Sequence, residues 1–267
     1  MESTHGSLVY ENVVPCGGCD NHVQFVCEPC NDSFCKACVG EHLSKRDSGS
    51  HDVKYHQSFS EKQQKTRKGQ RNVPVIKCVV DGWQMSGKTS MIKAYIDGKC
   101  PDFGSIQPTL HDVHSVDYQY QGSEVAIHLY DIPSCEFYEG LKRLFLQEQT
   151  YDVFLLCIPI DFVNFEKESN NLLKDLHSCL PDPPPIIVIA TKIDLRNKIG
   201  DERQQKLLKS DELRNFAQTI NAVNYFECSA IKNESFADIL QAVAAIYFTP
   251  GRMKKNRHHL IKHCLLM

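Results

Sequence analysis

Residues 82–89 (GWQMSGKT) constrain the fold more than any other stretch, because they fit the phosphate-loop pattern G-x-x-x-x-G-K-[ST]. The apolar residues 75–80 before them are typical of a buried strand, and residues 90–95 after them are typical of the first turns of a helix. A strand, a tight turn and a helix N-terminus aim backbone N–H groups and the positive end of a helix dipole at one point. This stretch therefore predicts a binding site for nucleotide phosphates.

Composition limits the class of protein and the cellular compartment to which such a loop could belong. The 267 residues suffice for one large domain or two unequal ones, and 42% apolar with 24% charged residues is typical of globular proteins. A net charge of −3 argues against a globally basic nucleic-acid binder. No apolar run approaches the roughly 20 residues needed to cross a bilayer, and the N-terminus shows no secretory signal. We therefore expect a protein of the reducing cytosol, whose 13 cysteines are thiols or metal ligands.

Six of those cysteines lie within residues 16–38 as three C-x2-C pairs, with histidines following at spaced intervals. Eight such ligands can hold two tetrahedral Zn²⁺ ions, and so short a segment has too little apolar material to fold without metal. Over residues 13–56 the spacing resembles a B-box zinc finger of the first type, found in tripartite-motif proteins. The resemblance implies two structural zinc ions, the first bound by Cys16, Cys19, Cys35 and Cys38, and the second by Cys27, Cys30, His42 and either His51 or His56.

Residues 57–72 are polar and charged, without apolar periodicity, and are predicted to form a flexible linker. Beyond them, residues 73–248 alternate strand and helix patterns, as in a doubly wound α/β fold. Further strands are expected at residues 113–120, 124–130, 153–158, 186–190 and 225–226, and helices at 136–147, 166–180, 211–221 and 235–247.

Four further motifs fall at predicted strand ends, where such a fold binds its ligand. They are Pro108-Thr109, Asp131, residues 191–194 (TKID) and residues 228–230 (CSA). With them, residues 73–267 resemble a Rho/Rac-type small GTPase, most clearly at residues 185–188 (PIIV), 191–196 (TKIDLR) and 225–230 (YFECSA). The resemblance implies the P-loop small-GTPase fold, a mostly parallel six-stranded sheet with helices on both faces. The charged residues 197–209 match a helical insertion of that family, although a solvated surface helix explains them equally well.

Base recognition has a chemical explanation. The Asp194 carboxylate can accept hydrogen bonds from N1–H and N2–H of guanine, a donor pair that adenine lacks. The aliphatic part of Lys192 can cover the face of the base. By resemblance, the backbone N–H of Ala230 donates to guanine O6.

Phosphate and metal binding are expected at the loop itself. Lys88 would reach the β- and γ-phosphates and Thr89 would bind Mg²⁺. By resemblance, Thr109 completes the Mg²⁺ site as part of the first switch, and Asp131 holds the metal through water. The full predicted set for GTP or GDP is Gly82, Ser86, Gly87, Lys88, Thr89, Ser90, Thr109, Asp131, Thr191, Lys192, Asp194, Ser229 and Ala230.

The residues that depart from the family pattern stand at positions that serve GTP hydrolysis in the family. Gln84 stands where the family carries a glycine, and its side chain would crowd the γ-phosphate. Ser134 replaces a glycine whose N–H meets that phosphate, Cys135 replaces the glutamine that positions water, and Pro133 stiffens the hinge before them. No catalytic residue is therefore predicted, and GTP hydrolysis should be weak or absent.

Residues 249–267 form a tail that ends Cys264-Leu265-Leu266-Met267, a prenylation signal with the terminal methionine typical of farnesylation. Five Lys or Arg and no acidic residue precede it in residues 251–263, the second signal that makes anchoring stable. The tail lacks interleaved aromatic residues, so no nucleic acid is expected. We expect a lipid anchor at Cys264 and a location on the cytoplasmic face of the plasma membrane or of endomembranes.

Two functions fit these observations. The first is a membrane-anchored, GTP-bound signalling protein of Rho type, which binds effectors through the Thr109 loop and a protein partner through the B-box. The second is a scaffold or adaptor protein that contains a degenerate GTPase module. Guanine nucleotide that copurifies with the protein would distinguish them.

Overall fold

The computed structural model describes residues 73–102, 112–132, 134, 139–147, 149–162, 164–180, 182–197 and 207–249. In the N-terminal part it describes residues 15–16, 19–22, 25–27, 30, 32–34, 38–39, 42 and 53–55. The predicted linker, the tail from residue 250 onward and most of the charged insertion lie outside these ranges. Within them, no helix combines the length and apolar character that crossing a membrane would require. The chain divides into two compact units, Met1–Gln70 and Arg71–Met267.

The N-terminal unit contains short antiparallel strands. β1 (Pro15–Cys16) pairs with β2 (Cys19–His22), and a second sheet has the order β4-β3-β5, formed by Asp32–Phe34, Phe25–Cys27 and Val53–Tyr55. Among the described residues of this unit, the buried apolar side chains are Phe25, Cys27, Phe34 and Val39.

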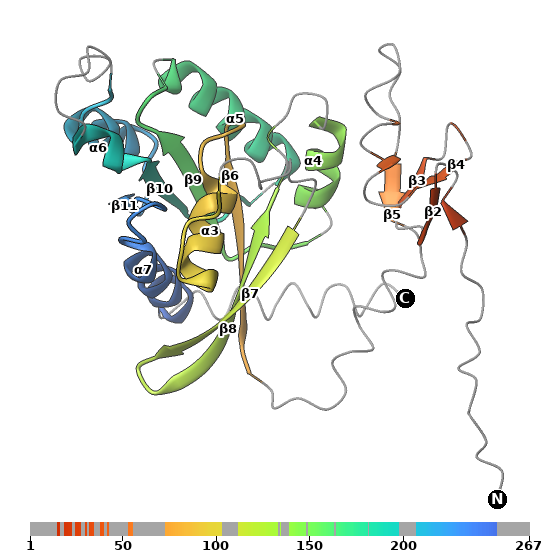
Figure 1. Cartoon of the computed structure of the whole chain (residues 1–267), viewed down its shortest axis with the longest axis horizontal. Helices are drawn as coiled ribbons and strands as arrows, with labels where there is room; N and C mark the ends of the chain where they lie inside the picture. The colour runs from red at the N-terminus through yellow and green to blue at the C-terminus, as the bar shows by residue number, and fades with distance from the viewer. Residues whose placement is uncertain are drawn as a thin grey trace, which may run out of the picture. The chain divides into compact units, whose positions relative to one another are not determined.

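The second unit is built on one six-stranded sheet of order β11-β10-β9-β6-β8-β7 (Figure 1). Neighbouring strands run parallel except β7 and β8, which form a hairpin through the turn at Gln121-Gly122. The strands are β6 (Val75–Gly82), β7 (Asp112–Tyr120), β8 (Ser123–Asp131), β9 (Val153–Pro159), β10 (Ile186–Thr191) and β11 (Asn224–Glu227). Every predicted strand is confirmed, and each extends one or two residues beyond its predicted range.

The predicted helices are confirmed as well, with ends that shift by one or a few residues. They are α3 (Lys88–Asp97), α4 (Glu139–Gln147), α5 (Phe165–Cys179), α6 (Ser210–Thr219) and α7 (Phe236–Phe248). The short 3-10 helix η4 (Ile193–Asn197) follows β10. For α4, the predicted residues 136–138 lie outside the described residues.

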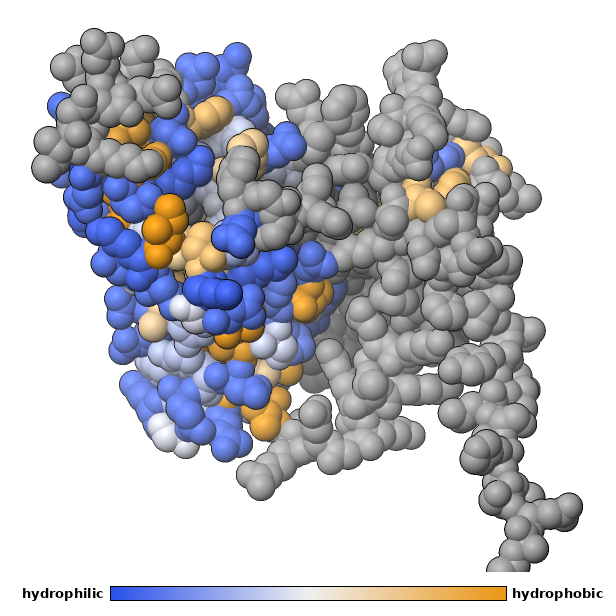
Figure 2. Space-filling view, viewed as in Figure 1, coloured by the Kyte–Doolittle hydropathy of each residue, from blue (hydrophilic) through white to orange (hydrophobic). Residues whose placement is uncertain are grey.

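Alternation along the strands divides the core between two faces of the sheet. On β6, Cys78 and Val80 join the buried cluster under α3 and α7, while Asp81 projects to the opposite face and meets Lys142 of α4. β9 and β10 are buried along their whole length, as expected for central parallel strands covered on both faces. In the view of Figure 2, the described surface of this unit is mostly hydrophilic, with hydrophobic residues in small separate groups.

We predict that Gly82→Ala strongly destabilises the second unit. Gly82 has φ 151°, and a Cβ there would lie 2.3 Å from the backbone oxygen of Cys157 on β9. The free energy of unfolding in denaturant should fall by about 3 kcal/mol or more, because backbone strain and overpacking add. Gly122→Ala is the matched control: its φ is 81° with nothing within 4 Å, so only the strain of about 1–2 kcal/mol remains. Equal losses in the two variants would contradict this account of Gly82.

Candidate nucleotide-binding site

The phosphate loop connects the end of β6 to the start of α3. Two glycines allow the turn, since Gly82 and Gly87 have φ of 151° and 92°, and Ser86 N–H donates to Trp83 O (3.1 Å) to close it. Gly87 is the N-cap residue of α3 and has no side chain to accept hydrogen bonds from the first helical turn. N–H groups at such a helix start bind anions. The loop therefore has the backbone geometry of a phosphate site.

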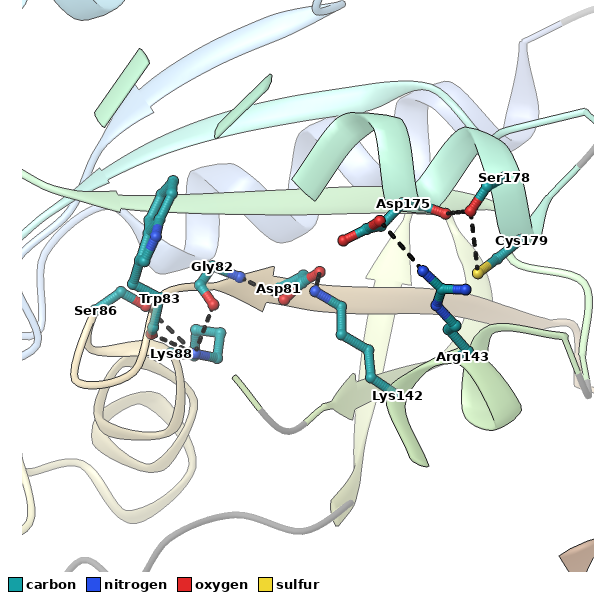
Figure 3. Close-up of polar contacts among 10 residues, drawn as sticks. All are labelled: Asp81, Gly82, Trp83, Ser86, Lys88, Lys142, Arg143, Asp175, Ser178 and Cys179. Atoms are coloured by element: carbon teal, nitrogen blue, oxygen red, sulfur yellow. Dashed lines mark hydrogen bonds and ion pairs between the residues drawn. The ribbon is translucent and has the colours of Figure 1, made fainter. Parts of the chain in front are cut away.

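Lys88 supplies the positive charge inside this loop. Its side chain is buried, and Nζ donates to the backbone oxygen of Trp83 (2.8 Å), with longer contacts to Gly82 O (3.5 Å) and Ser86 Oγ (3.4 Å) (Figure 3). Burial lowers the pKa of Lys88, and the carboxylates of Asp131 and Asp81 act in the opposite direction. The ammonium is thus held under the loop, where phosphate oxygens could replace neutral carbonyl partners.

Thr89 and Asp131 form the oxygen-rich side of the site. Thr89 Oγ1 donates a hydrogen bond of 2.5 Å to Asp131 Oδ2 at the end of β8. Burial raises the pKa of Asp131, against the opposing influence of Lys88 and of the Thr89 hydrogen bond. A hydroxyl and a carboxylate at this separation fit Mg²⁺, which prefers hard oxygen ligands. Thr109, the other predicted ligand, lies outside the described residues.

The residues predicted to bind the base gather after β10 and β11. Ser229 Oγ donates to Asp194 Oδ1 (2.8 Å) and accepts from the backbone N–H of Lys232 (3.2 Å), which fixes the orientation of the Asp194 carboxylate. Lys192 adopts φ 61°, and its Nζ forms contacts of 3.0 and 3.1 Å with the Asp161 carboxylate. Ala230, half-buried, directly follows Ser229.

One hydrogen bond joins the base side to the phosphate loop. The Thr191 hydroxyl, at the end of β10, donates to the backbone oxygen of Ser86. Both side chains are buried, so the bond is shielded from water. All the predicted nucleotide-binding residues other than Thr109 therefore belong to one continuous edge of the sheet, at the carboxyl ends of its parallel strands.

Comparison with known proteins agrees with this geometry. Residues 77–248 match the model of the Ras family. The chain belongs to the Ras family. It is 27% identical over 194 residues to the Rho-related GTP-binding protein RhoH of Bos taurus, covering 72% of this chain and 98% of that protein. RhoH of Mus musculus is also 27% identical, over 183 residues, with 68% and 92% covered. The expected small-GTPase fold is thus confirmed, and the family implies binding of GTP or GDP, Mg²⁺ and effector proteins.

In this Ras-family domain, two of the residues expected to impair hydrolysis can be placed. Gln84 is exposed in the phosphate loop, and the exposed side chain of Met85 follows it at φ 61°. Ser134 lies half-buried shortly after Asp131. Pro133 and Cys135 fall outside the described residues, so their roles stay predictions.

A second cluster lies in the N-terminal unit, outside the region matched by the family. Ligand atoms of Cys27, Cys30 and His42 all lie within 4.8 Å of one another. β3 ends at Cys27, Cys30 lies in the turn before β4, and the His42 ring stacks on Phe34 with centroids 4.2 Å apart. Two thiols and an imidazole fit three positions of a tetrahedral zinc site. The predicted fourth ligand, His51 or His56, lies outside the described residues.

The other predicted zinc site can be traced only in part. Cys16 and Cys19 occupy opposing positions in the β1–β2 pair, as a C-x2-C hairpin requires. Cys38 is half-buried beside the buried Val39, and Cys35 lies outside the described residues. The assignment of this site therefore stays a prediction.

Sequence reasoning missed three contacts around the nucleotide site. Lys142 forms a buried ion pair with Asp81, and Asp161 binds Lys192. The Trp83 ring also packs on Phe162, with centroids 4.8 Å apart. One signal for the first contact was available, since Asp81 interrupts the apolar run that leads into the phosphate loop. No local pattern identifies Lys142 as the partner of Asp81.

We predict that Asp194→Ala greatly reduces guanine-nucleotide affinity. The variant removes the carboxylate that would accept two hydrogen bonds from the base, and a titration with fluorescent GDP should show a Kd raised about a hundredfold or more. Asp211→Ala is the control, because Asp211 is exposed in the first turn of α6. An Asp194→Ala protein that binds GDP as tightly as this control would exclude Asp194 as the base-reading residue.

Proposed function

We propose that this chain is a Rho-type, membrane-anchored GTP-binding signalling protein that hydrolyses GTP slowly and recruits a protein partner through a B-box-like zinc unit. The convergence of Lys88, the Thr89–Asp131 pair and the Ser229–Asp194 pair on one edge of the sheet carries the nucleotide part of this proposal. The likeness to the Rho-related RhoH proteins supports the Rho-type assignment.

Each of these groups has a distinct part in holding the nucleotide. Lys88 and the amides at the start of α3 bind the β- and γ-phosphates. Thr89, Thr109 and, through water, Asp131 hold Mg²⁺, which neutralises phosphate charge when bound. Asp194, oriented by Ser229, selects guanine. The Thr109 loop presents the bound state to effector proteins.

Slow hydrolysis is expected from the residues that would surround the γ-phosphate, Gln84 and Cys135. An arginine finger from an activating protein contributes roughly 10³–10⁵ in rate, but only beside an oriented water. Gln84, exposed in the loop, would stand in the approach of such a finger. A thiol at Cys135 cannot both accept from water and donate to phosphate as a glutamine amide does. Bound GTP would therefore persist and keep effectors engaged.

Single-turnover phosphate release from GTP-loaded protein tests this proposal. We expect slow release that barely responds to a Rho-type activating protein, whereas a Gln84→Gly, Pro133→Ala, Ser134→Gly, Cys135→Gln variant regains stimulation. Each single replacement should do little, because the groups serve one transition state and their effects are not additive. Wild-type turnover equal to that of an ordinary Rho GTPase would refute slow hydrolysis and leave nucleotide binding intact.

The zinc unit is proposed from its ligand spacing and from the grouping of Cys27, Cys30 and His42. Bound zinc would supply the constraint that so short a segment, with little apolar material in its sequence, needs in order to fold. By the B-box resemblance, this unit would bind a protein partner.

We predict about two zinc ions per chain by elemental analysis of the purified protein. Cys27→Ser should release at least one of them and unfold the N-terminal unit, while GDP binding stays unchanged because the nucleotide site lies in the other unit. Cys100→Ser is the control, since Cys100 lies in the second unit outside both predicted ligand sets. A wild-type protein that folds with no zinc would rule out the assignment.

Membrane anchoring is proposed to depend on Cys264 and on the basic tail that precedes it. A farnesyl group on Cys264 together with five nearby Lys or Arg residues would give the two signals that stable attachment to an anionic membrane needs. The proposed location is the cytoplasmic face of the plasma membrane or of endomembranes.

A scaffold or adaptor function is the second candidate. It is favoured by the exposed Gln84 and by Ser134, which replace glycines of the family pattern. Purified protein that carries no guanine nucleotide and fails to bind added GTP with Mg²⁺ would support it against the signalling proposal.

A further inference from the structure

An ion pair is buried directly under the phosphate loop. Lys142 Nζ of α4 lies 2.6 Å from Asp81 Oδ2 at the end of β6, and their side chains are 10% and 1% exposed (Figure 3). The residues before Asp81 on this strand, Val79 and Val80, are apolar and fully buried. A charge in such surroundings is costly unless it is paired. The Asp81 carboxylate can therefore be charged at low cost only while Lys142 is paired with it.

Asp81 is also connected to the loop that follows it. Its Oδ1 accepts a hydrogen bond from the Gly82 N–H (2.7 Å), and the carbonyl oxygen of Gly82 contacts Lys88 Nζ (3.5 Å). The Asp81 carboxylate thus contacts α4 through one oxygen and the first residue of the phosphate loop through the other. The Asp81–Gly82 hydrogen bond is not needed to close the loop, because the hydrogen bond between Ser86 N–H and Trp83 O already closes it.

Both charges of the pair act on the ammonium that would receive the phosphates. Asp81 raises the pKa of Lys88 and Lys142 lowers it, although burial remains the largest influence. A bound phosphate, being negative, experiences the reverse: Asp81 repels it and Lys142 attracts it. With the pair intact, the positive charge of Lys142 opposes the effect of the Asp81 carboxylate.

We propose that Lys142 neutralises Asp81 under the phosphate loop, so that the position of the Lys142 ammonium sets how tightly the loop holds nucleotide phosphates. The inference rests on the proposed nucleotide binding, and it names the Asp81–Lys142 pair as the contact that controls nucleotide affinity. When Lys142 is withdrawn, a bare buried carboxylate remains near Lys88 and opposes the phosphates.

A second ion pair on α4 provides an internal comparison. Arg143, the next residue, lies 3.7 Å from Asp175 of α5, with side chains 52% and 34% exposed (Figure 3). This pair also fastens α4, but solvent screens it and it contacts no residue of the phosphate loop in the described structure. It separates the effect of loosening α4 from the effect of exposing the Asp81 charge.

The test measures GDP affinity and GDP release in the full-length protein with Mg²⁺ for wild type, Lys142→Met, Asp81→Asn, the double variant and Arg143→Met. Lys142→Met keeps the aliphatic side chain and removes the ammonium, so GDP affinity should fall by about tenfold or more and release should accelerate in proportion. Asp81→Asn keeps an oxygen for the Gly82 N–H and leaves Lys142 uncompensated, so GDP should bind as tightly as in wild type or more tightly. The double variant and Arg143→Met should both stay within about twofold of wild type.

The opposite response of the two single variants is the decisive result. A pair that only stabilises the fold would make both single variants bind GDP more weakly, in step with their melting temperatures. Such parallel losses, or unchanged affinity in Lys142→Met, would overturn the inference. If Lys142→Met does not fold, weakened binding in Asp81→Asn or in the double variant would overturn it equally. Wild-type protein that binds no GDP would instead refute the proposed function, and this inference with it.

Discussion

The close approach of Gly82 to the Cys157 carbonyl determines where the chain leaves the sheet and the phosphate loop begins. β6 and β9 pair up to this point, and only a residue without a Cβ can pass the neighbouring backbone and turn into α3. The turn places Lys88 back under the loop and points the start of α3 at the same space. The Ser86–Thr191 hydrogen bond then connects this loop to the strand that carries the residues for base recognition. The backbone geometry at Gly82 thus places the phosphate loop beside the residues that would bind the base.

Buried polarity in the described residues is concentrated at this edge. The buried polar or charged side chains are Asp81, Ser86, Lys88, Asp131, Lys142, Ser169, Thr191 and Ser229, and all except Ser169 lie in or beside the nucleotide site. Two lysines and two aspartates among them balance in charge. Such a set can be buried at lower cost, because each charge has an opposite charge nearby. It also offers little surplus positive charge for a triphosphate, so helix dipole, backbone amides and Mg²⁺ have to provide the rest.

The two units achieve stability in different ways. The Ras-family domain buries continuous apolar strands on both faces of its sheet, and these contacts suffice to hold polar groups in place at one edge. In the N-terminal unit, the described residues comprise short strands, four buried apolar side chains and a group of two thiols with an imidazole. If zinc binds there, the unit would fold or unfold with its metal, independently of the nucleotide state of the other unit.

The sequence by itself determined the order and kind of the elements in the second unit, because apolar runs, turn residues and the glycine pattern act locally. It also predicted which residues gather at the strand ends, since a parallel sheet brings its carboxyl ends together at one edge. Tertiary structure alone decided the pairings. Asp81 and Lys142 meet because α4 packs on the face of the sheet toward which alternate β6 side chains point, and Lys192 meets Asp161 because β9 and β10 are neighbours. No local pattern encodes such contacts, since each depends on where two separately formed elements come to lie.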